Sequence, residues 1–326
     1  MTSAPTHPTV FAVFGPTAVG KTEFALALAR RLRAVGRHPV AVSADALQVY
    51  RGLEVLTGVA TREQQDELEH RLVSIADLSE RFSAGRFMAQ AHAEIDARLG
   101  RGHTPIVVGG TGLYLRAALA DLTLAPPPTT ELRERWLREL QSRGPQALHA
   151  ELARRAPQAA RRIAPADRSR IVRALELHEL GALPERAGQS QLWTTSMRHS
   201  TRLIGLTRPR EELYARIGDR VDAMLDAGAA DEVRAADAAG ASATARQALG
   251  FAELLHGDVE AMKQRTRRYA KRQLTWMRKL AGVTLIDLGG RSADEVVASL
   301  DIIDALDGSP LVAASQHTPR GDGEGA

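Results

Sequence analysis

The chain has 326 residues, of which 44% are hydrophobic and 25% charged, and it contains no cysteine. This composition is typical of a globular protein and excludes a disordered chain, a disulfide-stabilised scaffold and a thiolate metal site. The longest apolar runs fall far short of the roughly 20 residues that a membrane-spanning helix needs, and the first residues lack the segments typical of a secretion signal. We therefore expect a cytoplasmic protein with no membrane contact.

The charge balance is only weak evidence for a nucleic-acid partner. Lysine and arginine number 43 against 39 acidic residues, for a net charge of +4, although the isoelectric point is about 9.7. The positions of the four lysines are more informative. Lys21 lies in a glycine-rich segment, and the other three lie in one basic stretch near the C-terminus.

The first third of the chain alternates short apolar runs with helical patterns. Strands are predicted at 10–14, 40–44, 72–75 and 106–108. Such alternation predicts right-handed βαβ crossovers, and hence an α/β fold with a parallel sheet covered on both faces. We expect the chemistry at the carboxyl ends of the strands.

After Leu124 the pattern changes, because a run of three prolines is followed by helical periods only, up to about Gly181. One helix is expected to carry Leu132, Trp136, Leu137 and Leu140 on one face, and another to begin after the N-cap Asp167. A strand at 203–206 and a further helical pattern then return to the core. The predicted organisation is a core at 9–124 and 201–308, an inserted helical subdomain at 125–200, and a disordered tail at 309–326.

A phosphate-binding loop is predicted between the first strand and the first helix. The segment 15–22 matches GxxxxGK(S/T) in the strand and helix context that this motif requires. Backbone N–H groups, the helix N-terminus and Lys21 would bind a diphosphate or triphosphate, and Thr22 would hold Mg²⁺. The eight binding residues are Gly15, Pro16, Thr17, Ala18, Val19, Gly20, Lys21 and Thr22. The core is therefore expected to be P-loop NTPase-like.

Asp45 follows the second predicted strand, which places it beside the phosphate loop. From its position alone it could hold Mg²⁺ or take a proton from an acceptor, or it could simply cap the next helix. The segment 109–112 ends another predicted strand with two glycines before Thr111. The glycines would let a ligand approach the backbone, and the hydroxyl would bind a phosphate or a bridging oxygen.

Residues 265–279 contain seven lysines and arginines among aromatic residues and no acid. At helical spacing Arg268, Arg272 and Lys279 share a face with Trp276, while Tyr269 is expected to point elsewhere. A second basic cluster includes Arg161, Arg162 and Arg168 in the predicted insertion. Two basic elements flanking a phosphate site indicate a polyanion that contacts both parts of the protein.

Together these segments resemble the tRNA dimethylallyltransferases, also called tRNA isopentenyltransferases. The resemblance extends from about Val10 to about Asp287 and rests on seven motifs in order: GPTAVGKT (15–22), SADALQVY (43–50), HRLVSI (70–75), VGGTGLY (108–114), DRSRIVRALE (167–176), QALGF (247–251) and RYAKRQLTWMR (268–278).

The resemblance implies transfer of a dimethylallyl group from dimethylallyl diphosphate to N6 of the adenosine at tRNA position 37, with Mg²⁺ as the metal. The partners expected are a tRNA anticodon stem-loop and dimethylallyl diphosphate, bound by a monomer. The resemblance makes Asp45 the general base and places Thr111 at the reacting centre. It assigns tRNA contacts to Asp45, Ala46, Leu47, Gln48, Arg133, Ser169, Arg170, Ile171, Val172, Arg173 and Gln247, and the basic helix adds Arg268 and Arg272.

This sequence departs from the family pattern at Ala46, at 55–58 and at Gln247. These departures leave the general base and the phosphate loop in place. The alternative functions are a P-loop kinase acting on a small molecule or nucleotide, an enzyme that alkylates free adenine nucleotide, and a nucleotide-switched RNA-binding module without chemistry of its own. None of these three accounts for the inserted subdomain, both basic elements and Asp45 together.

Overall fold

The computed structural model describes residues 9–184, 191–301 and 306. The chain divides into two compact units, one formed by Leu122–Gln191 and the other by the residues before and after it. Among the helices that the structure describes, none is long and apolar enough to cross a bilayer.

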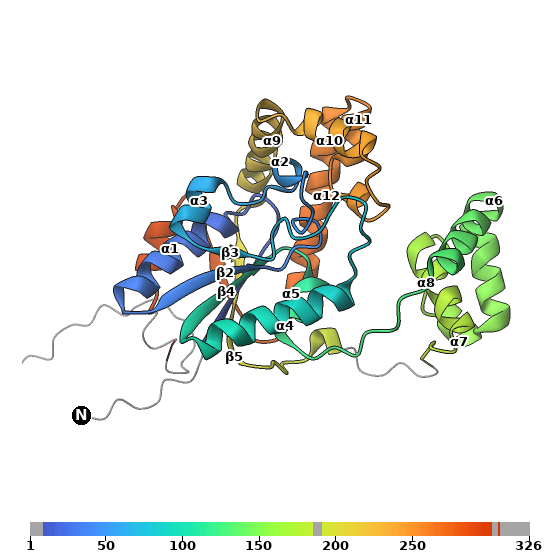
Figure 1. Cartoon of the computed structure of the whole chain (residues 1–326), viewed down its shortest axis with the longest axis horizontal. Coiled ribbons are helices and arrows are strands. Elements are labelled where there is room, and N and C mark those ends of the chain that lie inside the picture. The colour runs from blue at the N-terminus through green and yellow to red at the C-terminus, as the bar shows by residue number, and fades with distance from the viewer. Residues whose placement is uncertain (1–8, 185–190, 302–305, 307–326) are drawn as a thin grey trace, which may run out of the picture. The chain divides into compact units, whose positions relative to one another are not determined.

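The first unit is built on a six-stranded parallel sheet with strand order β3-β2-β4-β1-β5-β6 (Figure 1). The strands are β1 (Thr9–Phe14), β2 (His38–Ser43), β3 (His70–Arg71), β4 (His103–Gly109), β5 (Ser200–Thr207) and β6 (Val283–Asp287). In the central strand β1, Phe14 is paired with Gly109 of β4 on one side and with Gly205 of β5 on the other. The parallel sheet confirms the predicted α/β fold, and it brings the ends of β1, β2 and β4 together.

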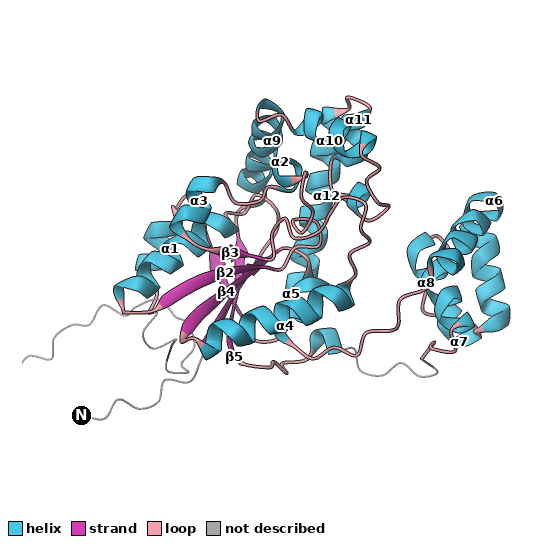
Figure 2. Ribbon diagram, in the orientation of Figure 1, coloured by secondary structure: helices cyan, strands magenta, loops and turns pink. Residues whose placement is uncertain are grey.

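Helices lie on both sides of this sheet (Figure 2). In chain order they are α1 (Lys21–Ala34), α2 (Glu54–Thr57), α3 (Arg62–Glu67), α4 (Ala84–Gly100), α5 (Gly112–Leu119), α9 (Arg210–Asp226), α10 (Ala229–Ala238), α11 (Phe251–Leu255), α12 (Val259–Met277) and α13 (Ala293–Ala298). The apolar faces of α1, α9 and α12 bury Phe24, Ile217 and Ala270 against strand residues such as Phe11 and Ile204.

One predicted strand is wrong, and the strand β6 was not predicted. The run at 72–75 is not a strand, because Leu72 and Ser74 have φ values of 61° and 50°, and β3 ends at Arg71. Conversely, β6 lies at the edge of the sheet, beside β5 alone. Its Leu285 is 59% exposed, so this strand does not form the continuous buried run that reveals the central strands.

The second unit is helical and has a hydrophobic core of its own. It contains α6 (Thr130–Arg155), α7 (Pro157–Ala160) and α8 (Arg168–Glu179), which bury residues that include Trp136, Leu140 and Leu175. Asp167 caps α8 as predicted, because its Oδ1 accepts a hydrogen bond from Arg170 N at 3.1 Å. Leu137 was expected on the buried face but is 42% exposed.

The boundaries of the helical unit differ from the predicted 125–200. Residues 192–199 belong to the first unit, where the buried Arg116 of α5 donates to Thr194 Oγ1 at 3.2 Å and to the Ser196 carbonyl at 3.0 Å. These contacts were not predicted because residues 194–199 form neither a helix nor a strand and are not strongly apolar. The predicted tail at 309–326 lies outside the described residues.

Candidate active site

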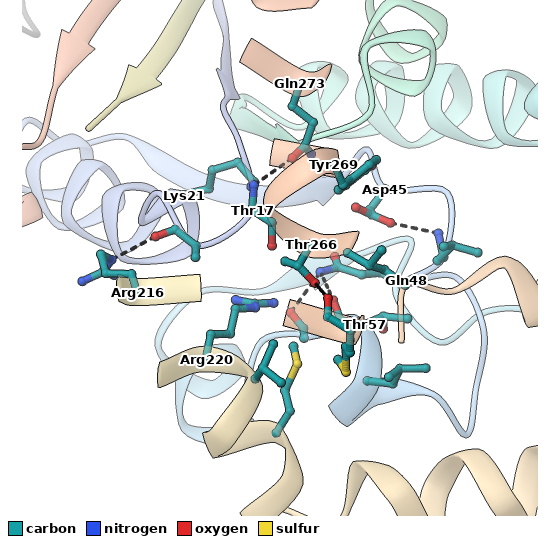
Figure 3. A pocket seen from close by; sticks show the side chains of 18 of the residues that line it. Thr17, Lys21, Asp45, Gln48, Thr57, Arg216, Arg220, Thr266, Tyr269 and Gln273 are labelled. Atoms are coloured by element: carbon teal, nitrogen blue, oxygen red, sulfur yellow. Dashed lines mark hydrogen bonds between the residues drawn. The ribbon is translucent and has the colours of Figure 1, made fainter. Parts of the chain in front are cut away.

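A cavity of about 630 Å³ lies in the first unit at the carboxyl ends of β1, β2 and β4 (Figure 3). The phosphate loop, the segment after β2 and Thr111 after β4 contribute to its wall, and α9 and α12 supply much of the remainder. Five cationic side chains and three acidic side chains line it: Lys21, Arg216, Arg220, Arg265 and Arg272, with Glu23, Asp45 and Asp219. The cavity therefore suits an anionic ligand.

The loop between β1 and α1 turns sharply so that α1 begins at Lys21. Gly20 has a φ of 107°, which favours glycine, and Ala18 also has a positive φ of 63°. Thr17, Ala18, Gly20, Lys21 and Thr22 line the cavity. Val19 is instead buried in the core and does not line it, and neither do Gly15 and Pro16.

Lys21 is held inside the curve of the loop. Its Nζ donates to the carbonyl oxygens of Gly15 at 3.2 Å and Pro16 at 2.9 Å. Burial, and secondly the positive charge of Arg220, lower the pKa of Lys21 to about 8, while Asp45 and Glu23 oppose this shift. An anion bound in the loop would favour the charged form of this lysine.

Three arginines that were not predicted from the sequence pack around the phosphate loop. Arg216 of α9 donates to the Ala18 carbonyl at 2.9 Å, and Arg208 donates to the Val19 carbonyl at 2.8 Å. Arg220 lies one turn after Arg216 and lines the cavity, and burial lowers its pKa. The spacing of four residues between Arg216 and Arg220, on a helix whose other face is apolar and buried, was the available signal, but it does not indicate what these arginines contact.

Asp45 lies in the turn after β2, with its side chain at the cavity wall (Figure 3). Its Oδ1 accepts a hydrogen bond from Leu47 N at 2.9 Å, which is a local Asx turn and not the cap of a helix. No described residue donates a hydrogen bond to the other carboxylate oxygen, Oδ2. A carboxylate oxygen is thus available to a ligand in the cavity.

Thr111 also faces the cavity, but the glycines before it have a different role from the one expected. A Cβ at Gly109 would lie 2.5 Å from the Ala44 carbonyl oxygen, and a Cβ at Gly110 would overlap the Gln273 side chain. Glycine is therefore required by the close approach of the protein's own backbone and side chains. The Thr111 hydroxyl forms a 3.1 Å hydrogen bond with the hydroxyl of Tyr269.

One face of α12 forms part of the cavity wall, and it is not the face predicted. Tyr269 and Gln273 line the cavity (Figure 3), whereas Trp276 packs against Phe14, with ring centroids 6.2 Å apart. Burial raises the pKa of Tyr269 to about 12, and the charge of Asp45 adds to this shift. Arg268 and Arg272 are exposed on the helix, as expected, and Arg272 also lines the cavity.

The remaining predicted contact residues of the first unit lie at the same cavity: Ala46, Leu47, Gln48 and Gln247. The amide of Gln48 is already used within the protein. It accepts from Ser43 Oγ at 2.8 Å and donates to the carbonyls of Thr57 at 3.3 Å and Gly58 at 3.0 Å. Gln48 therefore holds the segment after α2 in place.

The segment 55–58, where the sequence departs from the family pattern, is a well-supported helical turn. Glu232 of α10 accepts hydrogen bonds from Val55 N at 3.0 Å and Leu56 N at 2.7 Å. Gly58 ends the turn with a φ of 63°, and a Cβ there would overlap the guanidinium of Arg220. Glycine at this position thus leaves room for Arg220.

The predicted contact residues of the helical unit do not form one exposed surface. Ile171 and Val172 are buried in its core, so their side chains are not part of an exposed surface. Arg133 and Arg173 both bind the buried Glu176, at 3.2 and 3.3 Å, and Arg173 also donates to the Pro126 carbonyl at 2.7 Å. Ser169 and Arg170 are exposed. A helix that packs on one side buries the residues of that face and exposes those of the opposite face.

No group of three or more metal-ligating histidines or acids occurs among the residues that the structure describes. Oxygen ligands do gather beside the phosphate loop, where Thr22, Ser43 and Asp45 line a second, smaller cavity of about 40 Å³. Such oxygen donors suit Mg²⁺, which is usually held by few protein ligands together with phosphate and water.

Residues 48–280 match the family model described as IPP transferase. The chain is 42% identical over 299 residues to the tRNA dimethylallyltransferase of Symbiobacterium thermophilum, which covers 87% of this chain and 92% of that protein. It is also 42% identical over 280 residues to the tRNA dimethylallyltransferase of Kineococcus radiotolerans, with 82% and 87% covered.

Solved structures also resemble this one, including the following two. The tRNA isopentenylpyrophosphate transferase of Bacillus halodurans matches with a TM-score of 0.64 and 35% identity, over 89% of this chain and 93% of that chain. A eukaryotic dimethylallyltransferase, captured in crystallographic snapshots acting on tRNA, matches with a TM-score of 0.72 and 25% identity. The match covers 93% of this chain and 80% of that chain.

Proposed function

Because the chain belongs to the IPP transferase family, we propose that it transfers a dimethylallyl group from dimethylallyl diphosphate to N6 of adenosine 37 of tRNA. The products are N6-isopentenyladenosine and diphosphate. One observation supports this most directly: the phosphate loop, Asp45 and Thr111 line a single cavity. A leaving diphosphate and an amine that must lose a proton can therefore be bound side by side.

Asp45 acts as the general base. The lone pair of an exocyclic adenine amine is delocalised into the ring, so the amine is a weak nucleophile. A carboxylate that removes the proton as the new C–N bond forms lowers the barrier. The support is geometric, since one oxygen of Asp45 is fixed by Leu47 N and the carboxylate lies at the cavity wall.

The phosphate loop stabilises the leaving group. As the C–O bond of the substrate breaks, negative charge grows on the diphosphate and positive charge on the allylic carbon. Lys21, Arg220 and the free loop amides stabilise that negative charge. The Thr17 amide is not among these donors, because it already donates to Gln273 Oε1 at 2.9 Å.

Thr22 would hold the Mg²⁺ ion that accompanies the diphosphate. The metal would supply further charge neutralisation on the leaving group. Thr22 lines the large cavity as well as the small one that Ser43 and Asp45 also line, so the hydroxyl is accessible to a metal bound to the ligand. Chelation of Mg²⁺ by EDTA is expected to stop transfer.

The RNA-binding surface includes the exposed arginines of α12. Arg272 is both exposed and part of the cavity wall, so it can contact a phosphate next to a base that enters the cavity. The adenine must leave the stack of the anticodon loop to reach Asp45. We expect the enzyme to act as a monomer, and a tRNA substrate supports a cytoplasmic location.

The direct test is transfer of radiolabelled dimethylallyl diphosphate to an unmodified anticodon stem-loop in the presence of Mg²⁺. Label should enter RNA that has adenosine at position 37 and not a matched RNA with guanosine there. Equal labelling of both RNAs would contradict the choice of N6 of adenosine 37. No labelling of either RNA would overturn the proposed function.

A further inference from the structure

Helix α12 contacts three successive residues of the turn that follows β4. The Tyr269 hydroxyl binds Thr111 Oγ1 at 3.1 Å, and Gln273 Nε2 donates to the Gly110 carbonyl at 2.8 Å. Trp276 packs so closely against Gly112 that a Cβ there would overlap the indole ring. The position of Thr111 in the cavity is thus set by α12.

Gln273 also binds the phosphate loop. Its Oε1 accepts a hydrogen bond from Thr17 N at 2.9 Å, and the side chain is only 5% exposed. One buried amide therefore joins the loop after β1 to the turn after β4. An unsatisfied buried amide is costly, so both contacts are favoured together.

We propose that Gln273 is a positioning residue for the transfer: it holds the diphosphate-binding loop at a fixed distance from Thr111 and from the amine that Asp45 deprotonates. The inference rests on the proposed function, because it concerns the geometry of that reaction. Gln273 acts through the loops it joins and not through contact with the reacting atoms.

Misplacement of the loop should have a chemical signature as well as a slower rate. A displacement of about 1 Å can reduce the rate about 100-fold. When the amine is not aligned, water attacks instead: its oxygen bonds to the allylic carbon, diphosphate leaves with the electron pair of the C–O bond, and a proton is released. The products are dimethylallyl alcohol and diphosphate. Loss of alignment therefore raises the ratio of alcohol to prenylated RNA.

The test compares three variants of the full chain with wild type. Gln273→Met removes both hydrogen bonds at similar volume, while Gln273→Glu keeps the acceptor for Thr17 N and loses the donor to Gly110. Thr275→Val is the matched control, because Thr275 is exposed on the same helix and, among the described residues, its hydroxyl binds only the Lys271 carbonyl. The alcohol, the prenylated RNA, kcat and KM for dimethylallyl diphosphate are measured for each.

For Gln273→Met we expect kcat to fall at least about tenfold, KM to change little, and the ratio of alcohol to prenylated RNA to rise at least about fivefold. Gln273→Glu should be intermediate, and it carries the test if the methionine variant does not fold. Thr275→Val should match wild type. A ratio unchanged from wild type in the folded variants would overturn the inference, even if kcat falls. Failure of wild type to transfer at all would instead refute the proposed function.

Discussion

Asp45 uses one carboxylate oxygen to hold its own turn and has the other available at the cavity wall. Asp45→Asn preserves the first contact, because the amide oxygen can still accept from Leu47 N, but a neutral amide cannot take a proton. We expect kcat to fall by about 10²- to 10⁴-fold with tRNA affinity unchanged. Single-turnover kinetics and an RNA-binding titration check this, and turnover close to wild type would remove Asp45 as the base.

At the scale of residues, the cavity residues in segments that follow strands were predicted from the sequence, whereas several cavity residues on helix faces were not. Asp45 and Thr111 come shortly after the ends of β2 and β4, and Lys21 begins the helix that the loop after β1 leads into. Parallel strands place their carboxyl ends together. Gln273 and Arg220 lie inside long helices, where periodicity separates buried from exposed positions but does not indicate which neighbour is contacted. The partial burial of Tyr269 beside Thr111 depends on how α12 packs on the sheet, which no local pattern reveals.

At the scale of elements, the turn after β4 packs closely against helix α12. This packing can be tested without changing a polar group. A Cβ at Gly110 would overlap Gln273 and would lie 3.3 Å from the Gly15 carbonyl oxygen. Gly110→Ala should therefore displace Gln273 and slow transfer at least about tenfold. Steady-state transfer kinetics measure this effect.

Gly218→Ala on α9 is the matched control for that substitution. Gly218 lies inside a helix and a Cβ there meets nothing within 4 Å, so alanine should raise the free energy of unfolding by about 0.5 to 1 kcal/mol. Denaturant unfolding of both variants provides the comparison. Full transfer activity in Gly110→Ala would show that the close fit between turn and helix is not needed.

The exposed side of α12 carries the arginines proposed to bind tRNA phosphates. Replacing Arg268 and Arg272 with glutamine should weaken tRNA binding and lower the slope of log affinity against log salt concentration by about two. Diphosphate binding should be maintained, because the phosphate loop is unchanged. Titrations at several salt concentrations measure the slope, and an unchanged slope would place the RNA contact elsewhere.

Elements were predicted well where their pattern is regular and poorly where backbone or edge effects dominate. The central strands β1, β2 and β4 are continuous buried runs and were found. The two positive φ angles at Leu72 and Ser74 ended β3 early, and nothing in the side chains of these residues signals that conformation. In α12 the arginines Arg268 and Arg272 were correctly predicted to be exposed. The two aromatic residues were placed on the wrong faces, because Tyr269 lines the cavity and Trp276 packs against Phe14.

At the scale of the whole molecule, basic side chains occur on both compact units. Arg161 and Arg162 are exposed on the helical unit. If one tRNA contacts both units, replacing these two arginines with glutamine should lower the salt slope by about two, and adding Arg268→Gln and Arg272→Gln should lower it further by a similar amount. Non-additive slopes, or no effect of the first pair, would contradict binding by both units.

The central claim is that the phosphate loop binds a leaving group for prenyl transfer and does not serve a kinase. The measurement that tests it most directly is incubation of the purified protein and Mg²⁺ with unmodified tRNA and either dimethylallyl diphosphate or ATP, followed by mass spectrometry of the nucleosides and analysis of the nucleotides. We expect N6-isopentenyladenosine with dimethylallyl diphosphate only, and no ADP from ATP. Formation of ADP without a modified nucleoside would contradict the proposed transferase and favour the kinase.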